Sequence, residues 1–375
     1  MKKLFFIALV LLQQSCLYAQ KKTGNSPGNF LRPEQWEVEP GKVEFTGSGD
    51  QSVMKITNAG TVARLKNIEF ANGIIEYDVQ LQEPGFASIY FRMQDMLETE
   101  CFYLRGGRAG NPVAMDAIQY APFLKGVNLW DLLPQYQAAA ELYPDRPNHI
   151  KLVISGKKML AYVNSSQWPA LQIPLLEGNT IKGAIAFDGK VIISHLTIKP
   201  NETEGLSPEA GMDITNNDPR YLRSWKVSAP FEFPVGQELY SKLLPDSTVQ
   251  WQPIHAERAG LVNLTRLLGG GNYLKRQAVW LKVVLQVKKE QTKKMDFGFS
   301  DEVWVYLNGK TIYTDKNLYP EAMRKVPDGR ISVENAQFEL PLKTGDNELL
   351  IGVANNFYGW GIIARLGSMD GVVIK

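Results

Sequence analysis

Apolar and polar residues alternate in short runs along most of the chain. Runs such as Gly73–Leu81, Ala87–Met93 and Lys158–Val163 are bounded by Gly, Pro, Asn or Asp. Alternating runs spaced roughly ten residues apart, with turn residues between them, are typical of antiparallel β-sandwiches. Helical periodicity is almost absent. The same pattern predicts further strands at Val53–Thr57, Cys101–Arg105, Ala117–Tyr120, His149–Ser155, Ile181–Phe187 and Val191–Ile198.

A polar stretch divides these strands into two groups. The strand-like runs pause at Pro200 and resume at Trp225, and residues 201–219 are rich in Asn, Glu, Pro and Gly, as interdomain linkers are. We therefore expect an all-β protein with two tandem β-sandwich (jelly-roll) domains, at residues 36–200 and 220–375. Strands of the second domain are predicted at Trp225–Val227, Ala278–Val287, Met295–Phe299, Val303–Leu307, Thr311–Thr314, Gln337–Pro341, Glu348–Asn355 and Ile362–Leu366. Asn308-Gly309 predicts a tight hairpin turn between two of them.

The amino terminus has the pattern of an export signal. Lys2 and Lys3 precede the apolar run Leu4–Leu12, which is too short to span a membrane as a mature helix. We expect a signal peptide at residues 1–19 and a flexible leader at residues 20–35. Cleavage after Ala19 and lipoprotein processing with a lipid anchor at Cys16 both remain open. No other run of about 20 apolar residues occurs, so no transmembrane segment is expected and the protein is predicted to be periplasmic, cell-surface or secreted.

Charge and cysteine content narrow the function classes. The 375 residues carry 41 basic and 39 acidic side chains, so the net charge of +2 gives no electrostatic reason to expect nucleic acid or an anionic membrane as partner. Only Cys101 certainly remains after processing, which excludes an intramolecular disulfide in the mature chain. The three histidines have no metal-binding spacing, so no metal site or cofactor is predicted. The one exception is a structural calcium ion, which a loop of a β-sandwich can hold.

Two neighbouring strands place tyrosine and arginine side chains together. Strand alternation puts Tyr90 and Arg92 on one face of the first strand, and Tyr103 and Arg105 on one face of the next. Gln119, one strand further on, extends the row. Arginine donates to hydroxyls or carboxylates, and tyrosine rings stack on the apolar side of a sugar. The row predicts a glycan-binding groove; the alternative is a solvated outer face with ordinary cross-strand pairs.

A loop tryptophan and two carboxylates of the first domain are further site candidates. Trp130 and Trp168 lie in loop-like segments, where tryptophan can serve as a binding platform, and we include Trp130 in the predicted ligand site. Glycoside hydrolysis needs two carboxylates about 5 to 9.5 Å apart. If the protein is an enzyme, Glu100 or Asp116 is the candidate for the acid/base residue, but no residue is assigned a catalytic role.

Both halves resemble known families. NGIIEYDVQL, ASIYFRM, CFYLRGG and HIKLVISGKKMLAYVN resemble concanavalin A-like lectin/glucanase domains, in particular laminin-G-like and 3-keto-disaccharide-hydrolase-like members in exported bacterial proteins. SWKVSAPF, FGFSDEVWVYLNGKTIY and LPLKTGDNELLIGVANNFYGWGIIARL resemble the galactose-binding-like jelly rolls appended to glycoside hydrolases, which are usually non-catalytic. Hydrolase-like members usually carry Asn-Ser-Gly before the Phe-Arg strand, whereas this chain has Ala87-Ser88-Ile89.

Three functions follow from these observations. The leading hypothesis is an exported, non-catalytic carbohydrate-binding protein that recognises a glycan through the tyrosine- and arginine-lined face of the first domain. The first alternative is a glycoside hydrolase, of the 3-keto-disaccharide-hydrolase-like kind, or a lyase that uses the same groove. The second alternative is an extracellular structural or protein-interaction module.

Overall fold

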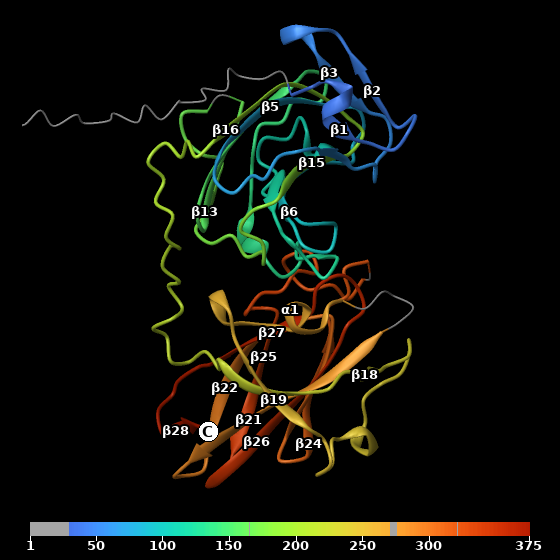
Figure 1. Ribbon diagram of the computed structural model, residues 1–375. Helices are drawn as coiled ribbons and strands as arrows, with labels where there is room; N and C mark the ends of the chain where they lie inside the picture. Colours follow the sequence, from blue (N-terminus) through green and yellow to red (C-terminus); the bar gives the residue numbers. More distant parts are fainter. Residues whose placement is uncertain (1–29, 165, 271–275, 321) are drawn as a thin grey trace, which may run out of the picture.

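The chain folds into two β-sandwiches joined end to end (Figure 1). The computed structural model describes residues 30–164, 166–270, 276–320 and 322–375. The predicted signal peptide, Cys16 and residues 20–29 of the predicted leader lie outside the described residues. The predicted all-β class with two tandem sandwiches is confirmed. Within the described residues, no helix is long and apolar enough to cross a membrane.

The first sandwich consists of two seven-stranded antiparallel sheets. One, here called the β6 sheet, has the order β1 (Trp36–Glu37), β4 (Ala63–Leu65), β15 (Ala184–Asp188), β6 (Phe86–Met93), β7 (Glu100–Arg105), β8 (Ile118–Tyr120) and β11 (Gln137–Ala138). The other, the β5 sheet, has the order β14 (Leu171–Ile173), β13 (Lys158–Val163), β12 (Asn148–Ser155), β5 (Gly73–Leu81), β16 (Val191–Pro200), β3 (Val53–Ile56) and β2 (Val43–Thr46). Their facing sides bury one apolar core, which includes Ile75, Tyr77, Phe91, Phe102, Leu104 and Leu152. A hairpin of β9 (Phe123–Leu124) and β10 (Val127–Asn128) lies outside both sheets.

The second sandwich pairs a larger sheet with a smaller one. The larger sheet has the order β19 (Trp251–His255), β17 (Ser224–Ser228), β21 (Gln277–Val287), β26 (Gly345–Ala354), β23 (Glu302–Leu307) and β24 (Lys310–Lys316), with β18 (Phe231–Glu232) and β28 (Val372–Ile374) also paired to β21. The smaller has the order β20 (Leu261–Asn263), β27 (Gly361–Leu366), β22 (Gln291–Ser300) and β25 (Ala336–Leu342), and the short helix α1 (Leu264–Leu268) follows β20. The predicted hairpin turn is confirmed: Asn308 and Gly309 have φ angles of 51° and 77°, as a turn with two left-handed residues requires.

The segments before and between the sandwiches are more ordered than expected. Residues 30–35 are not a flexible leader, because Leu31 is only 4% exposed in the first core and Pro33–Gln35 form a 3-10 helix. Residues 201–219 contain no strand, and they form hydrogen bonds with both sandwiches. The Lys157 amide donates to the Pro208 carbonyl at 2.8 Å, and Arg258 donates to the Gly211 carbonyl at 2.9 Å. The linker therefore runs along the outside of the molecule and is held by hydrogen bonds to each sandwich (Figure 1).

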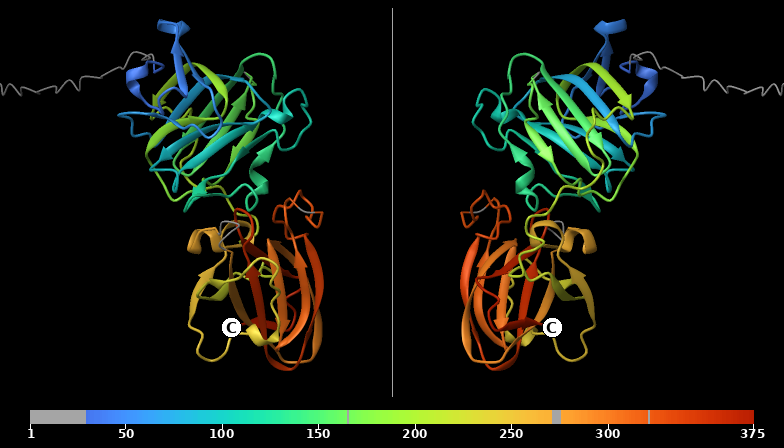
Figure 2. Two further views of the ribbon diagram at one scale, coloured as in Figure 1. Left: turned by 90° about the vertical axis from the view of Figure 1, so that its right-hand side faces the viewer. Right: turned by 90° about the vertical axis from the view of Figure 1, so that its left-hand side faces the viewer.

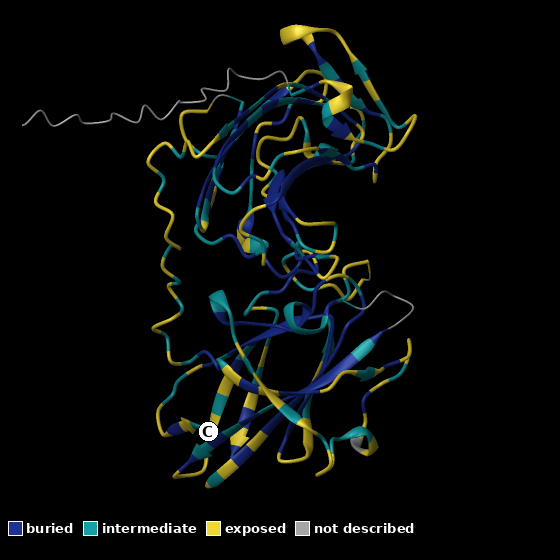
Figure 3. Ribbon diagram, viewed as in Figure 1, coloured by how far each residue is buried: buried dark blue, intermediate teal, exposed yellow. Residues whose placement is uncertain are grey.

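Apolar packing continues from one sandwich into the other. Tyr221, Leu261, Ile331 and Ile363 of the second sandwich are buried in the core cluster of the first. Figure 2 shows the loop-bearing end of the second sandwich against one end of the first, and Figure 3 shows buried residues in both sandwiches and at their junction. The loops of the second sandwich thereby reach the open face of the β6 sheet.

Candidate functional site

A cavity of about 580 Å³ lies where the two sandwiches meet. Its first-domain wall is the face of the β6 sheet that points away from the core, together with adjoining loops. Its other wall comes from second-domain loops. The first domain contributes Pro84, Gly85, Phe86, Ser88, Tyr90, Cys101, Tyr103, Arg105, Gly107, Arg108, Asp116, Phe123, Asn128, Trp130 and Asp188, and the second contributes Tyr319, Asp328, Arg330, Phe357 and Tyr358.

Aromatic rings from both domains form the apolar part of this cavity. The Trp130 ring lies 4.8 Å from that of Tyr319 and 5.9 Å from that of Tyr358, both edge-on. Tyr319 and Phe357 are parallel, with centroids 6.0 Å apart. A cavity with aromatic walls and a few convergent polar groups is the usual form of a small-ligand site.

Four of the six predicted ligand residues line the cavity: Tyr90, Tyr103, Arg105 and Trp130. Gln119 does not line the cavity, although it lies on the strand next to Tyr103, as predicted. Its fully buried amide oxygen accepts from the Tyr103 hydroxyl at 2.9 Å and from Arg105 at 2.6 Å, and its amide nitrogen donates to the Trp130 carbonyl at 2.8 Å. Gln119 therefore positions three lining residues instead of presenting its own side chain.

Arg92 contradicts the predicted row. Its backbone has a φ of 50°, and the pairing of β6 with β15 shifts register between Tyr90 and Met93. Strand alternation fails at such an irregularity, so Arg92 does not share the face of Tyr90. Its buried guanidinium donates to the Ala71 carbonyl at 2.8 Å and the Gly156 carbonyl at 2.7 Å, and thus ties loops of the first sandwich together.

Three arginines gather around one carboxylate in the cavity. Arg108 binds both Asp116 oxygens, at 2.9 and 3.0 Å. Arg105 and Arg330 approach Asp116 at 4.0 and 3.8 Å. Although burial opposes ionisation, the hydrogen bond from Arg108 and the charges of the three arginines hold the pKa of Asp116 below its usual value. Asp116 therefore remains an anion.

Of the two alternative acid/base candidates, Glu100 and Asp116, only Asp116 lines the cavity. Glu100 projects from β7 into the core side of the sheet, where it is fully buried and accepts from the Tyr120 hydroxyl at 2.6 Å. It does not line the cavity, whereas Asp116 does. Asp188 lines it as well: burial raises its pKa, and it accepts from the Tyr90 hydroxyl at 3.3 Å. Sequence reasoning missed Asp188, whose only signal was its place between a predicted strand and Gly189.

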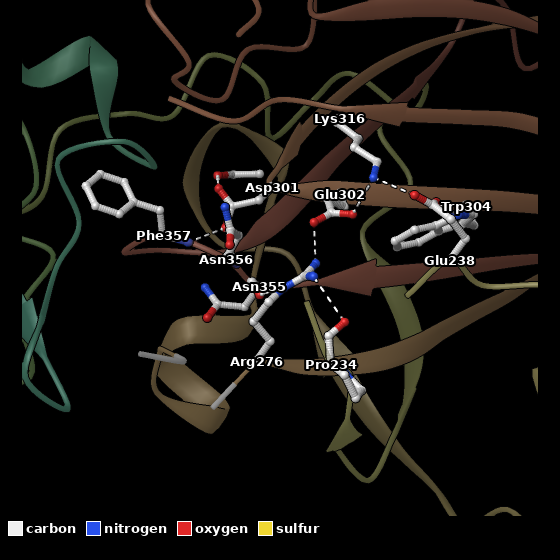
Figure 4. Close-up of polar contacts among 11 residues, drawn as sticks. Pro234, Glu238, Arg276, Asp301, Glu302, Trp304, Lys316, Asn355, Asn356 and Phe357 are labelled. Atoms are coloured by element: carbon white, nitrogen blue, oxygen red, sulfur yellow. Dashed lines mark hydrogen bonds and ion pairs between the residues drawn. The ribbon is translucent and has the colours of Figure 1, made fainter. Parts of the chain in front are cut away.

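Two buried carboxylates, one from each domain, hold the loop that carries Phe357 and Tyr358. Asp301 accepts from the backbone amides of Asn356 at 2.5 Å and Phe357 at 2.8 Å (Figure 4). Asp131 of the first domain accepts from the Gly359 amide at 3.1 Å. The ends of this aromatic loop are therefore fixed from both sides of the domain junction.

No metal site stands out in the described parts of the chain. They hold no group of three or more His, Cys, Asp or Glu side chains arranged to bind a metal ion. His149 and His195 lie on the β5 sheet, where each contacts Asp78, at 2.6 and 2.8 Å. Neither lines the cavity.

Because several carboxyl groups are buried, we predict that the thermal stability of the protein falls as pH rises from 5 to 8. Burial raises the pKa of Glu100, Glu177 and Asp301 to about 7, against roughly 4 in an unfolded chain. The folded state then binds more protons than the unfolded state, so this stabilisation is complete below about pH 4 and is lost as pH rises through about 7. We expect the thermal unfolding midpoint to be higher at pH 5 than at pH 8. Glu177→Gln should flatten this dependence, whereas Glu39→Gln, at an exposed position, should not. A midpoint that is level or rises between pH 5 and pH 8 would contradict the prediction.

Comparison with known proteins yields distant structural likenesses alone. No protein-family model matches the sequence, and no curated protein matches it. A carbohydrate-binding module, CBM66, from Bacillus subtilis superposes with a TM-score of 0.32 at 9% identity over 44% of this chain and 93% of that chain. A protein with a galectin-like fold from Bacillus subtilis superposes with a TM-score of 0.31 at 15% identity, over 45% of this chain and 91% of that chain. The VIP36 exoplasmic/lumenal domain, in a form with bound Ca²⁺ and Man3GlcNAc, superposes with a TM-score of 0.32 at 11% identity, over 46% of this chain and 87% of that chain. At these values the likenesses carry no inference, and function is inferred below from the protein's own cavity.

Proposed function

We propose that this protein is an exported carbohydrate-binding protein whose ligand occupies the cavity between the two domains. The observation that carries the proposal is the composition of the cavity wall. Aromatic rings from both domains stand beside guanidinium, carboxylate and hydroxyl groups. A sugar ring has apolar C–H faces and a rim of hydroxyls, so it is complementary to such a mixture.

The polar groups of the wall are held in place before any ligand binds. Arg105 donates to the Asp116 carbonyl at 2.7 Å and to Gln119 at 2.6 Å, and its guanidinium lies 5.1 Å from the Tyr103 ring centroid. A side chain fixed in this way loses little conformational entropy on binding. Export is proposed because Lys2 and Lys3 precede the apolar run Leu4–Leu12, as in a signal peptide. An exported protein would meet sugars outside the cell.

Binding without catalysis is favoured because Glu100 lies outside the cavity and Asp116 is surrounded by arginines. One observation favours hydrolysis as a second candidate. Asp188, with a raised pKa, and Asp116, with a lowered pKa, line the same cavity. Two carboxyl groups whose pKa values are pushed apart are what a general acid and a general base require.

Trp130→Ala is the variant that tests the proposed site. Purified protein is screened on a glycan array, and binding to the retained glycans is measured by calorimetry. We expect Trp130→Ala to weaken binding at least about tenfold, because a large aromatic contact is lost. Trp168→Ala is the matched control, since Trp168 is 78% exposed and does not line the cavity.

Each result of the test has a stated meaning. Equal losses from the two tryptophan variants would place the ligand elsewhere. Absence of glycan binding, together with a tight protein partner, would favour the interaction-module alternative and overturn the proposal. Reducing ends released from a bound glycan by the wild type, and no longer by Asp188→Asn, would show hydrolysis instead of binding alone.

A further inference from the structure

Arg330 is a buried cation without a hydrogen-bond acceptor among the described residues. It lines the cavity from the loop that precedes β25, and it is only 4% exposed. Its Nε is buried with no hydrogen-bond partner. Its terminal nitrogens lie 3.8 Å from Asp116 Oδ2 and 3.7 Å from Asp328 Oδ2, beyond hydrogen-bond range. A buried guanidinium in this state is costly unless an acceptor arrives from outside the protein.

The neighbouring charges do not satisfy Arg330. Both oxygens of Asp116 already accept from Arg108. Arg105 brings a second like charge, and burial followed by this charge lowers the pKa of Arg330. The carboxylate of Asp328 is more than half exposed and is therefore strongly screened. Around Asp116 the cavity thus has a local excess of positive charge.

The orientation of Arg330 is fixed by an aromatic ring. Its guanidinium carbon lies 5.1 Å from the centroid of the Trp130 ring, within the range of a cation–π contact. Trp130 in turn contacts Tyr319. The planar donor fork and the aromatic wall are therefore adjacent, and one ligand can contact both.

We propose that the cavity binds an acidic carbohydrate, a uronic acid residue whose carboxylate pairs with Arg330 while its ring lies along the wall of Trp130 and Tyr319. This inference rests on the proposed function and names its ligand class. A guanidinium fork can donate two parallel hydrogen bonds to a planar carboxylate. A carboxylate therefore fits Arg330 better than a monatomic anion does. The ligand carboxylate accepts hydrogen bonds from the terminal nitrogens of Arg330, which make none to the described residues, and offsets the excess positive charge.

The test compares sugars that differ only in charge. Oligogalacturonates and alginate oligosaccharides are titrated against the full protein by calorimetry, beside their carboxyl-reduced forms, a carrageenan oligosaccharide, which carries sulfate and no carboxylate, and a neutral glucan oligosaccharide. We expect at least one uronate to bind about 10- to 100-fold more tightly than its carboxyl-reduced form, as the loss of a charge-assisted hydrogen bond implies. This affinity should fall with rising salt concentration, because screening weakens the ion pair.

Variants then assign the effect to Arg330. Arg330→Met should abolish the difference between the acidic and the reduced ligand, and Arg330→Lys, which keeps the charge but loses the fork, should restore only part of it. Arg365→Met is the control: Arg365 pairs with Asp296 at 2.8 Å and does not line the cavity. Thermal midpoints are recorded for each variant. If Arg330→Met does not fold, the two ligand forms still decide the matter on the unmodified protein.

The outcomes separate this inference from the proposed function. Equal affinity for acidic and carboxyl-reduced sugars would overturn the inference and leave carbohydrate binding intact. Preference for the sulfated oligosaccharide over every uronate would overturn the carboxylate assignment. Absence of binding to all of these sugars and to the wider glycan array would overturn the proposed function itself.

Discussion

Replacing Arg276 with methionine is expected to lower the free energy of unfolding by about 3–5 kcal/mol. Arg276 and Glu302 are both almost fully buried and form a direct ion pair in the second sandwich (Figure 4). Arg276 also donates to the Asn355 carbonyl at 3.2 Å, next to the aromatic loop. The substitution leaves Glu302 buried with Lys316, at 3.3 Å, as its remaining partner. Urea unfolding of the wild type and the variant measures the loss.

A double variant distinguishes an unpaired charge from lost packing. Arg276→Met combined with Glu302→Gln removes both charges, so it should recover part of the stability lost in the single variant. A double variant as unstable as the single one would show that the loss comes from packing and from the backbone hydrogen bonds of Arg276. It would contradict the assignment of the effect to the ion pair.

Trp360→Ala is expected to destabilise the second sandwich by about 3–5 kcal/mol, the usual cost of deleting a large buried ring. Trp360 is 1% exposed, and its indole nitrogen donates to the Gly269 carbonyl at 2.7 Å. It directly follows the loop with Phe357 and Tyr358, and its backbone amide donates to Thr265 at 2.9 Å. We therefore expect ligand binding to weaken together with stability. Thermal unfolding and calorimetric titration measure the two effects.

Trp360→Phe separates ring volume from the indole hydrogen bond. This variant keeps a six-membered aromatic ring and loses the pyrrole part of the indole together with its donor to Gly269, so a smaller loss of about 1–3 kcal/mol is expected. Its ligand affinity should remain close to that of the wild type, because the loop keeps its support. A loss of binding as large as in Trp360→Ala would show that the aromatic ring alone does not position the loop, and that the complete indole with its hydrogen bond to Gly269 is required.

The second sandwich has a larger part in the site than its sequence suggested. The resemblance to appended jelly rolls implied fold more than ligand, and the ligand was expected in the first half. Tyr319, Arg330, Phe357 and Tyr358 nevertheless line the cavity together with Trp130. Each domain supplies one side of the site, so we expect neither domain alone to bind with full affinity.

The positions of the longer strands could be predicted from sequence alone. Gly73–Leu81 and Lys158–Val163 are strands with the predicted bounds, and β21 differs from its prediction by one residue, Gln277. Alternation over six or more residues is a strong signal because it reflects a buried face along a whole strand. Short strands such as β4 and β14 were missed, since three residues are too few to show a period.

Regular alternation also placed Tyr90, Tyr103 and Arg105 on one face, because a strand with regular geometry permits no other arrangement. Arg92 departs from this face because its backbone has a left-handed φ beside a register shift, and alternation carries no information about such irregularities. Arg330 and Phe357 could not be assigned to the site either, since they follow Trp130 by some two hundred residues and meet it only across the domain junction. The sequence by itself thus determined the sheets and much of one wall, through contacts that strand geometry dictates. Only the packing of the two sandwiches against each other decided the opposite wall, because that contact depends on surfaces assembled from distant parts of the chain.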